Sequence, residues 1–204
     1  MLAARHTDAL KQLVEQIRQA GGEAVYQVTD VSKAAEVQAL IDFAIATYGR
    51  IDVLDLNAGV VAFAPLNEHR IAGWDRMIDV NVKGVLYGLA AAIPVMEQQH
   101  GGQIIATDST AGHQVGNNNT VYASTKFSVR AIMDGLRSEE AHAHIRSMVV
   151  SPAFVDTGFF QDQRNSALGS VPKLRPENIA ALVVFAIEQP ENVDINEIIV
   201  RLRL

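Results

Sequence analysis

Two residues near the middle of the chain could carry acid–base chemistry together. Tyr122 and Lys126 stand four positions apart in the segment VYASTK, so on a helix their side chains lie on one face. A free tyrosine has a pKa of about 10 and is a poor base at neutral pH. A lysine ammonium nearby stabilises phenolate and lowers that pKa, which suits proton transfer to or from an alcohol or carbonyl oxygen. The alternative is a helix surface that carries an aromatic and a charged side chain without chemistry.

Other candidate site residues follow predicted strands at their carboxyl ends. Ser109 comes directly after the segment QIIATD, and small or polar residues in equivalent positions form TDV (29–31), NAG (57–59) and SPAFVDT (151–157). In open α/β sheets, ligands collect where the carboxyl ends of parallel strands meet. These four segments therefore predict one ligand-binding edge.

Alternating helices and strands would build this edge. Apolar periodicity and terminating residues predict helices over residues 8–20, 32–48, 71–98, 121–142 and 176–188, with Thr7 capping the first and Ser32 beginning the second. Strands are predicted over residues 23–28, 51–56, 103–108, 145–151 and 195–200. This alternation argues for an α/β fold with a doubly wound, mostly parallel sheet, covered by helices on both faces. No linker or repeat divides the sequence, so one domain over residues 1–204 is expected.

Composition narrows the function classes. The chain has 204 residues, 49% of them hydrophobic and 20% charged, and its net charge of −6 argues against a surface built for nucleic acid or anionic membrane. Cysteine is absent, which excludes disulfides, thiolate catalysis and cysteine metal sites. The N-terminal segment has no apolar stretch of signal-peptide length, and the longest apolar run, residues 84–96, is too short to span a membrane. A cytoplasmic protein without a membrane partner is the expectation.

The motifs together resemble those of short-chain dehydrogenases/reductases. VYASTK with Ser109 thirteen residues before Tyr122, together with NAG, NVKG and SPAFVDT, carries this resemblance, which covers essentially the whole chain. It implies a Rossmann-like fold and hydride transfer between a nicotinamide cofactor and a small carbonyl or alcohol compound. By this resemblance Tyr122 is the general acid in reduction and the base in oxidation, while Lys126 lowers its pKa and binds the nicotinamide ribose. Ser109 would hold the substrate oxygen. Asn81 of NVKG would help to organise a proton-relay water, the alternative being a helix-interior asparagine bonded to its own backbone.

The resemblance also assigns cofactor contacts at three strand ends. Adenine would lie against the end of the strand over residues 23–28, a wall at the sheet edge would follow the strand over residues 51–56, and the nicotinamide side would be reached from the end of the strand over residues 145–151. In that order these residues are Asp30 and Val31; Asn57, Ala58 and Gly59; and Pro152, Val155 and Thr157. For Asp30 a helix cap is the alternative.

Arg5 bears on the choice of cofactor. Family members that prefer NAD usually place an acidic residue at the end of the second strand, where it binds the ribose hydroxyls. Ala4 occupies this position here and Arg5 follows it, able to pair with a 2′-phosphate. NADP(H) is therefore predicted over NAD(H), the alternative being a surface arginine without a ligand.

The first structural unit of the family has no counterpart in the sequence. Members normally begin with a hydrophobic strand and a glycine-rich turn into a helix, whereas residues 1–5, MLAAR, resemble the end of the second strand. No G-x-x-x-G-x-G segment occurs elsewhere. The absence predicts a gap of two strand spacings, each about 4.8 Å, and the loss of the amide cradle that holds the pyrophosphate.

This anomaly leaves alternatives for the chain and for its function. Either Met1 is an internal start within a longer polypeptide, or the chain folds with a rearranged sheet. For these 204 residues alone, weak or absent cofactor binding is expected. A cofactor-free relative that serves as a binding module, or an inactive fragment, is the alternative to an enzyme.

Two residues and one segment near the predicted site have open roles. Asp108 stands where the family usually has serine, so its carboxylate could bias substrate charge or point away. His113 could line the substrate mouth or be an exposed loop residue. Residues 154–175 lack clear periodicity and could form a lid over the site or a surface loop.

Two further expectations concern other parts of the surface. In EEAHAHIR, the pairs Glu139–His142 and Glu140–His144 have metal-ligand spacing, but a solvated helix end is favoured and no metal is predicted. By resemblance, the long helix and the Tyr122 helix pack against other copies in a homodimer or homotetramer.

Overall fold

The computed structural model describes residues 1–160 and 171–203. The strands are β1 (Leu2–Ala4), β2 (Tyr26–Val28), β3 (Val53–Leu56), β4 (Gly102–Thr107), β5 (Ile145–Pro152) and β6 (Glu197–Val200). The α-helices are α1 (Thr7–Gln19), α2 (Ala34–Tyr48), α3 (Ile71–Ile78), α4 (Gly84–Gln99), α5 (Thr120–Glu139) and α6 (Pro176–Ile187). The short helical segments are η1 (Leu66–Glu68), η2 (Asp79–Lys83), η3 (Thr110–Gly112), η4 (Ala141–Ala143) and η5 (Gly158–Phe160).

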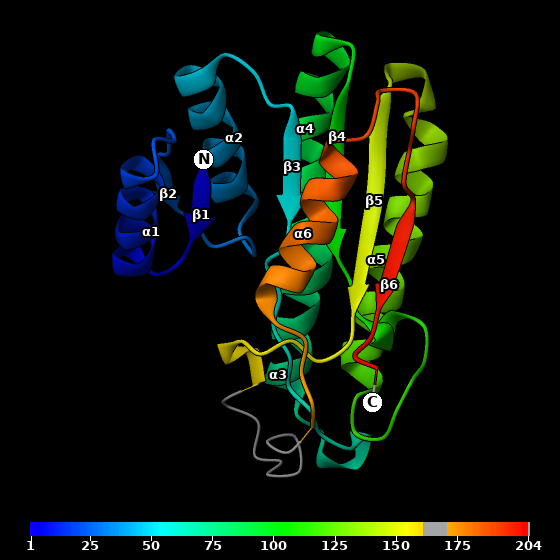
Figure 1. Cartoon of the computed structure of the whole chain (residues 1–204). Helices are drawn as coiled ribbons and strands as arrows, with labels where there is room; N and C mark the ends of the chain where they lie inside the picture. The colour runs from blue at the N-terminus through cyan, green and yellow to red at the C-terminus, as the bar shows by residue number, and fades with distance from the viewer. Residues whose placement is uncertain (161–170, 204) are drawn as a thin grey trace.

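The strands form two separate parallel sheets. One pairs β1 with β2, and the other has the order β3-β4-β5-β6, with Val53 opposite Gln103 and Gly102 opposite Ile145. Each of the edges β1 and β3 pairs with a neighbour on one side only. The split lies where the sequence predicts a gap, and Figure 1 shows β1 and β2 standing beside the larger sheet together with α1 and α2. The expected α/β architecture with parallel strands is thus confirmed.

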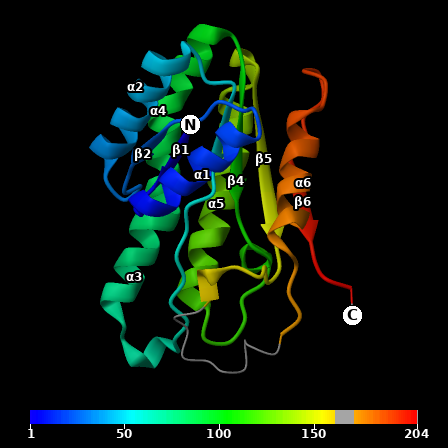
Figure 2. The same cartoon turned by 60° about the vertical axis from the view of Figure 1, so that its left-hand side comes forward.

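Helices cover both faces of the larger sheet. Parallel strands with apolar side chains on both faces require such cover, because both faces must be removed from water. On one face α4 and α5 pack against it, with α2 beside α4, and on the other lies α6 (Figures 1 and 2). The first interface contains Ala92, Met96 and Met133, all without exposed surface. The second contains Ile105 and Met148 of the sheet. Burial of this kind stabilises by about 25 cal/mol per Å² of apolar surface removed from water.

The long helix predicted over residues 71–98 is one continuous helical stretch with a change of pitch inside it. α3 passes into the π-helical segment η2 and then into α4, and Pro94 lies within α4. The stretch from Ile71 to Gln99, 29 residues, is long and apolar enough by composition to cross a membrane. Its residues Ala92 and Met96 are nevertheless fully buried against the sheet, which is the pattern of a core helix.

The starts predicted for the first two helices are wrong by one or two residues. Thr7 is the first residue of α1 rather than its cap, because His6 precedes the helix without a side-chain cap bond. α2 begins at Ala34 after Lys33, and Ser32 instead donates its hydroxyl to Asp30 Oδ1 at 2.7 Å. The end of α2 is as expected, since Gly49 adopts the left-handed conformation (φ 78°) that terminates helices.

Candidate active site

The predicted ligand-binding segments line two cavities that meet at the carboxyl end of β3. The inter-sheet cavity, of about 360 Å³, lies between β1 and β3. The catalytic cavity, of about 690 Å³, lies between the ends of β3, β4 and β5 and the first turns of α6. Residues 57–59 line both, so the two cavities adjoin there, and the pair is called the trough below.

The structure brings together the cofactor-binding residues that the sequence predicts, in two groups. The inter-sheet cavity is lined by Arg5, Asp30, Val31, Asn57, Ala58 and Gly59. The catalytic cavity is lined by Asn57, Ala58, Gly59, Tyr122, Lys126, Pro152, Val155 and Thr157. Gly59 joins the groups closely, because a Cβ atom there would lie 3.6 Å from Asn81 Oδ1 and 3.9 Å from Lys126 Nζ.

Tyr122 lies on α5 with 6% of its surface exposed. Its ring makes an edge contact with Phe63, centroids 5.9 Å apart, and a tilted contact with Phe159 at 6.4 Å. The side chain of Ser109 lies close enough to its hydroxyl to act on its pKa. Burial raises the pKa of Tyr122 above its ordinary value, and the charge of Asp108 adds to this, whereas the Ser109 side chain opposes it.

The lysine does not lower the tyrosine pKa in this structure, contrary to expectation. Lys126 is 4% exposed, and its ammonium donates to the carbonyl of Thr107 at 2.7 Å. It lies 5.9 Å from the centroid of the Tyr122 ring. Burial lowers the pKa of Lys126 to about 8, an effect that the negative charge of Asp108 opposes. Desolvation therefore decides both pKa shifts.

Asn81 is a clamp between three segments. It lies in η2 with 1% exposure, and its amide group accepts from Val60 N at 2.8 Å and donates to Val60 O at 2.9 Å. It also donates to Thr125 Oγ1 of α5 at 3.1 Å. The alternative of an asparagine bonded to its own backbone is wrong, because the partners lie 21 and 44 residues away. The π-helical pitch of η2 marks the point where this side chain turns inward.

At the other end of the trough, Arg5 directly follows β1 and is exposed. Asp30 nearby accepts from the backbone and the hydroxyl of Ser32, and these hydrogen bonds lower its pKa, with smaller contributions from Lys33 and Arg5. Asp30 therefore forms a local turn before α2 and does not cap the helix itself. Asp30 and Arg5 line the same cavity.

The trough fits part of a dinucleotide. Its polar lining residues and the close backbone approach at Gly59 suit a nicotinamide cofactor, with Lys126 and Thr157 at one end and Arg5 at the other. In the part of the chain that the structure describes, no helix N-terminus preceded by a glycine-rich turn faces the trough between these ends. The residues present therefore fit the two ends of such a group and lack the usual pyrophosphate support.

The sequence did not single out a third cavity, of about 630 Å³, beside the site. It is bounded by the backbone of residues 59–65, by α3 and by Phe159, and Glu68, Arg70 and Arg76 supply its charges. Glu68 and Arg70 form an ion pair. The polar segment NEHR after the apolar run VVAFAPL is the sequence signal that could have indicated it. Of the expected lid, residues 161–170 lie outside the described residues.

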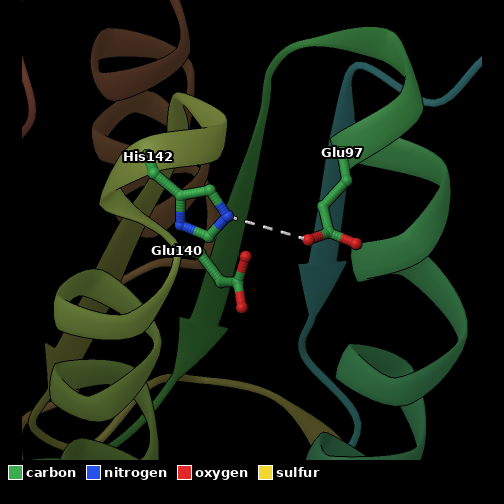
Figure 3. A group of neighbouring side chains, drawn as sticks. All are labelled: Glu97, Glu140 and His142. Carbon is green, nitrogen blue, oxygen red and sulfur yellow. Dashed lines mark ion pairs between the residues drawn. The ribbon is translucent and has the colours of Figure 1, made fainter.

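Of two histidines singled out by the sequence, His113 takes a position other than those expected, whereas His142 lies at a solvated helix end as favoured. His113 is neither at an open mouth nor exposed: its side chain is 17% exposed and lies 2.9 Å from Glu197. His142 lies 3.9 Å from Glu97 of α4, with Glu140 beside them, rather than pairing with Glu139 through side chains (Figure 3). The group of Glu97, Glu140 and His142 lies near the amino end of β5. It is therefore at the opposite edge of the sheet from the catalytic cavity. His142 is 72% exposed there, as in a solvated helix end.

Comparison with known proteins gives a consistent result. The family model described as short chain dehydrogenase matches residues 1–167. The uncharacterized oxidoreductase Lmo0432 of Listeria monocytogenes is 38% identical over 206 residues, covering 97% of this chain and 83% of the relative. The uncharacterized oxidoreductase SSP1627 of Staphylococcus saprophyticus is 40% identical over 211 residues, covering 98% and 84%.

Solved structures similar to this chain are also dehydrogenases. An alcohol dehydrogenase from the archaeon Thermococcus sibiricus, complexed with 5-hydroxy-NADP, has a TM-score of 0.89 and 28% identity over 98% of this chain and 84% of its own. A 7α-hydroxysteroid dehydrogenase complexed with NADH has a TM-score of 0.90 and 25% identity over 98% and 81%. By its matched residues, its relatives and its fold, the chain belongs to the short-chain dehydrogenase family.

Proposed function

We propose that the protein is an NADP(H)-dependent oxidoreductase that interconverts a carbonyl and an alcohol, with Tyr122 as general acid and base. The observation that carries this proposal is the burial of Tyr122 beside Ser109, one helical turn from the buried Lys126, in the wall of the catalytic cavity. A surface pair without chemistry would not need burial of both side chains.

The proposed roles follow from the positions of the side chains. In reduction, Tyr122 donates its proton to the developing alkoxide, and its raised pKa keeps that proton in place at neutral pH. Ser109 donates a hydrogen bond to the same substrate oxygen. In oxidation Tyr122 takes the proton back, while the Thr107 carbonyl holds the Lys126 ammonium beside its ring. Asn81 fixes the Val60 backbone and thereby the neighbouring wall at Gly59.

A nicotinamide cofactor, when bound, supplies or accepts the hydride. Asn57, Ala58, Gly59, Lys126, Pro152, Val155 and Thr157 are proposed to hold its nicotinamide half, and Arg5, Asp30 and Val31 its adenosine half. Arg5 supports NADP(H), because no acidic side chain stands at the end of β1 and a guanidinium there suits a 2′-phosphate. One structural relative is complexed with an NADP derivative and another with NADH. The proposed preference of this chain for NADP(H) therefore rests on Arg5 and not on its relatives.

The direct test is a titration of this chain with NADPH, with NADH as the matched control. Saturable binding that favours NADPH, followed by turnover of an alcohol or carbonyl compound that is lost in Tyr122→Phe, supports the proposal. A folded protein that binds neither nucleotide contradicts it.

One structural observation favours a second function. The sheet is split between β1 and β3, and the pyrophosphate support is lacking among the described residues. A chain that cannot hold its hydride carrier would act as a cofactor-free binding module of the same family. The nucleotide titration separates the two functions.

We also propose that the protein forms a homodimer or homotetramer through the outer faces of the long helix and α5. Large apolar side chains are exposed there, with Ile71 at 61%, Leu86 at 43% and Phe127 at 41%. Burying such side chains between copies would remove them from water.

A further inference from the structure

A cluster of polar side chains lies directly behind Ser109. Asp108 follows β4, Ser151 lies in β5 and Glu197 begins β6, while His113 follows η3. Ser151 Oγ is 3.2 Å from Asp108 Oδ2 and 3.3 Å from Glu197 Oε1. His113 Nε2 is 2.9 Å from Glu197 Oε1, 3.2 Å from Ser151 Oγ and 3.9 Å from Asp108 Oδ2.

Space for the carboxylate of Asp108 depends on a glycine. A Cβ atom on Gly112 would come within 2.2 Å of Asp108 Oδ2, far inside contact distance. The Asp108 side chain has no exposed surface, and its Oδ1 atom has no hydrogen-bond partner. The chain thus buries a carboxyl group at the position next to Ser109 and leaves half of it unsatisfied.

The hydrogen bonds in this cluster leave room for one more proton. Glu197 Oε1 can accept from Arg130 Nε at 3.2 Å and from His113, which leaves the single hydroxyl hydrogen of Ser151 for Asp108 Oδ2. No side-chain donor then remains for Asp108 Oδ1, and the backbone N–H of Ser109 only partly offsets the burial of the carboxyl group. A buried, unsatisfied carboxylate is costly, and a proton on Asp108 or its transfer through Ser151 removes that cost. Consistently, burial raises the pKa of Asp108 to about 6.

Charged groups on α5 face the same carboxyl group. Lys126 and Arg130 act on Asp108 as positive charges, and Asp108 in turn acts on Lys126 and Tyr122. With His113 after η3 and Glu197 on β6, these are the charged or titratable groups that the described elements packed around Asp108 present to it.

We propose that Asp108, His113 and Glu197, joined through Ser151, form a proton-sharing cluster, and that Asp108 is a positioning residue whose charge tunes Tyr122 and Lys126. When Asp108 is ionised, it holds Lys126 protonated and Tyr122 neutral, which favours proton donation in reduction. When the cluster gains its proton, this effect on Lys126 and Tyr122 disappears, so the rate of proton transfer at Tyr122 depends on the protonation of the cluster between about pH 5 and 7. This inference rests on the proposed function of Tyr122 as acid and base.

The first test needs no cofactor or substrate. Carboxyl ¹³C resonances are followed against pH in the whole chain, with Asp108 assigned from Asp108→Asn. We expect a midpoint near pH 6, a lower midpoint in Glu197→Gln because a negative neighbour is lost, and a higher one in Ser151→Ala because a donor is lost. Opposite shifts of this kind do not arise from general loosening of the fold. If neither variant changes the titration midpoint of Asp108, the proposed proton-sharing cluster does not exist.

The second test reads the effect on the catalytic pair. The Lys126 side chain is followed by ¹³C NMR, where Asp108→Asn should lower its midpoint from about 8 by about one pH unit, as expected for the loss of one charge within about 10 Å. The matched control is Asp134→Asn on the exposed side of α5, where the side chain is 69% exposed, and it should leave Lys126 unchanged. If alcohol oxidation is detected, the acid limb of kcat/KM should move down by a similar amount in Asp108→Asn. If the titration midpoint of Lys126 is the same in Asp108→Asn as in the wild type, the proposed role of Asp108 is wrong. If the midpoint shifts but the wild-type chain turns over no substrate, only the proposed function is wrong.

Discussion

The ammonium of Lys126 donates a hydrogen bond to the carbonyl of Thr107, 2.7 Å away, and is not directed at the hydroxyl of the tyrosine one turn before it. The catalytic helix α5 is thereby tied to the carboxyl end of β4, the strand that precedes Ser109. This bond holds the lysine at the wall of the catalytic cavity while burial lowers its pKa. The following predictions depend on this arrangement.

Replacing the tyrosine should remove activity and leave the fold intact. Phe in Tyr122→Phe keeps the ring contacts with Phe63 and Phe159 but cannot transfer a proton. We expect kcat/KM to fall by about 10²–10⁴-fold with the melting temperature nearly unchanged. Tyr48→Phe on the exposed end of α2 is the control and should retain activity. Retained turnover in Tyr122→Phe would contradict the acid–base role.

The buried lysine should make stability depend on pH in a defined window. The pKa of Lys126 is lowered from 10.5 to about 8 in the folded state, so the unfolded chain binds the extra proton between these values. The penalty of burying the charge is fully present below pH 8 and disappears as the pH rises toward 10.5. Relative to Lys126→Met, the wild type should gain about 1–3 kcal/mol in free energy of unfolding over this rise. Urea denaturation of both proteins at pH 7.5, 9 and 10 measures the difference, and a constant difference would refute the shift.

Removing the Asn81 clamp should destabilise the wall of the cavity. Asn81→Ala leaves the amide and carbonyl of Val60 without these partners and opens a space beside Thr125. We expect a loss of about 2–3 kcal/mol in free energy of unfolding. Asn67→Ala in the exposed turn η1 is the matched control and should change stability by less than about 0.5 kcal/mol. Equal effects of the two substitutions would show that the clamp contributes little.

Charge removal at the end of β1 should affect one nucleotide only. Arg5→Ala should weaken NADPH binding by about tenfold and leave NADH binding unchanged, because the guanidinium is proposed to meet the 2′-phosphate alone. Arg50→Ala, which removes an exposed arginine paired with Asp52, is the control. Calorimetric titration gives both affinities, and a parallel loss for NADH would assign Arg5 to another part of the cofactor.

The apolar outer face of the helices should hold copies together. Leu86→Glu places a charge on the 43% exposed position in α4 and should shift the protein to monomer in light scattering after size exclusion. Val184→Glu on α6, 49% exposed on the other face of the sheet, is the matched control and should leave the mass unchanged. A wild type that is already monomeric would contradict the proposed assembly.

The sequence by itself determined the order of helices and parallel strands and the four segments at the ligand-binding edge, because apolar periodicity and terminating residues act over a few neighbouring positions. The interruption between β1 and β3 was also predictable, since the unit that would fill it has no counterpart in the residues. The spacing of Tyr122 and Lys126 placed both on one face of a helix, but it could not show that both would be buried. Desolvation reverses the expected shift of the tyrosine pKa, and it depends on Phe63 and Phe159, which come from distant segments.

Only the tertiary structure decided the partners of Asn81 and Asp108. The Val60 contacts of Asn81 span 21 residues and the Ser151 contact of Asp108 spans 43, and no local pattern encodes either. They arise because strand register aligns the carboxyl ends of β4, β5 and β6 and because η2 turns its asparagine toward the segment after β3. Local periodicity fixes which elements form, whereas packing between elements fixes which polar groups lose water and must find one another.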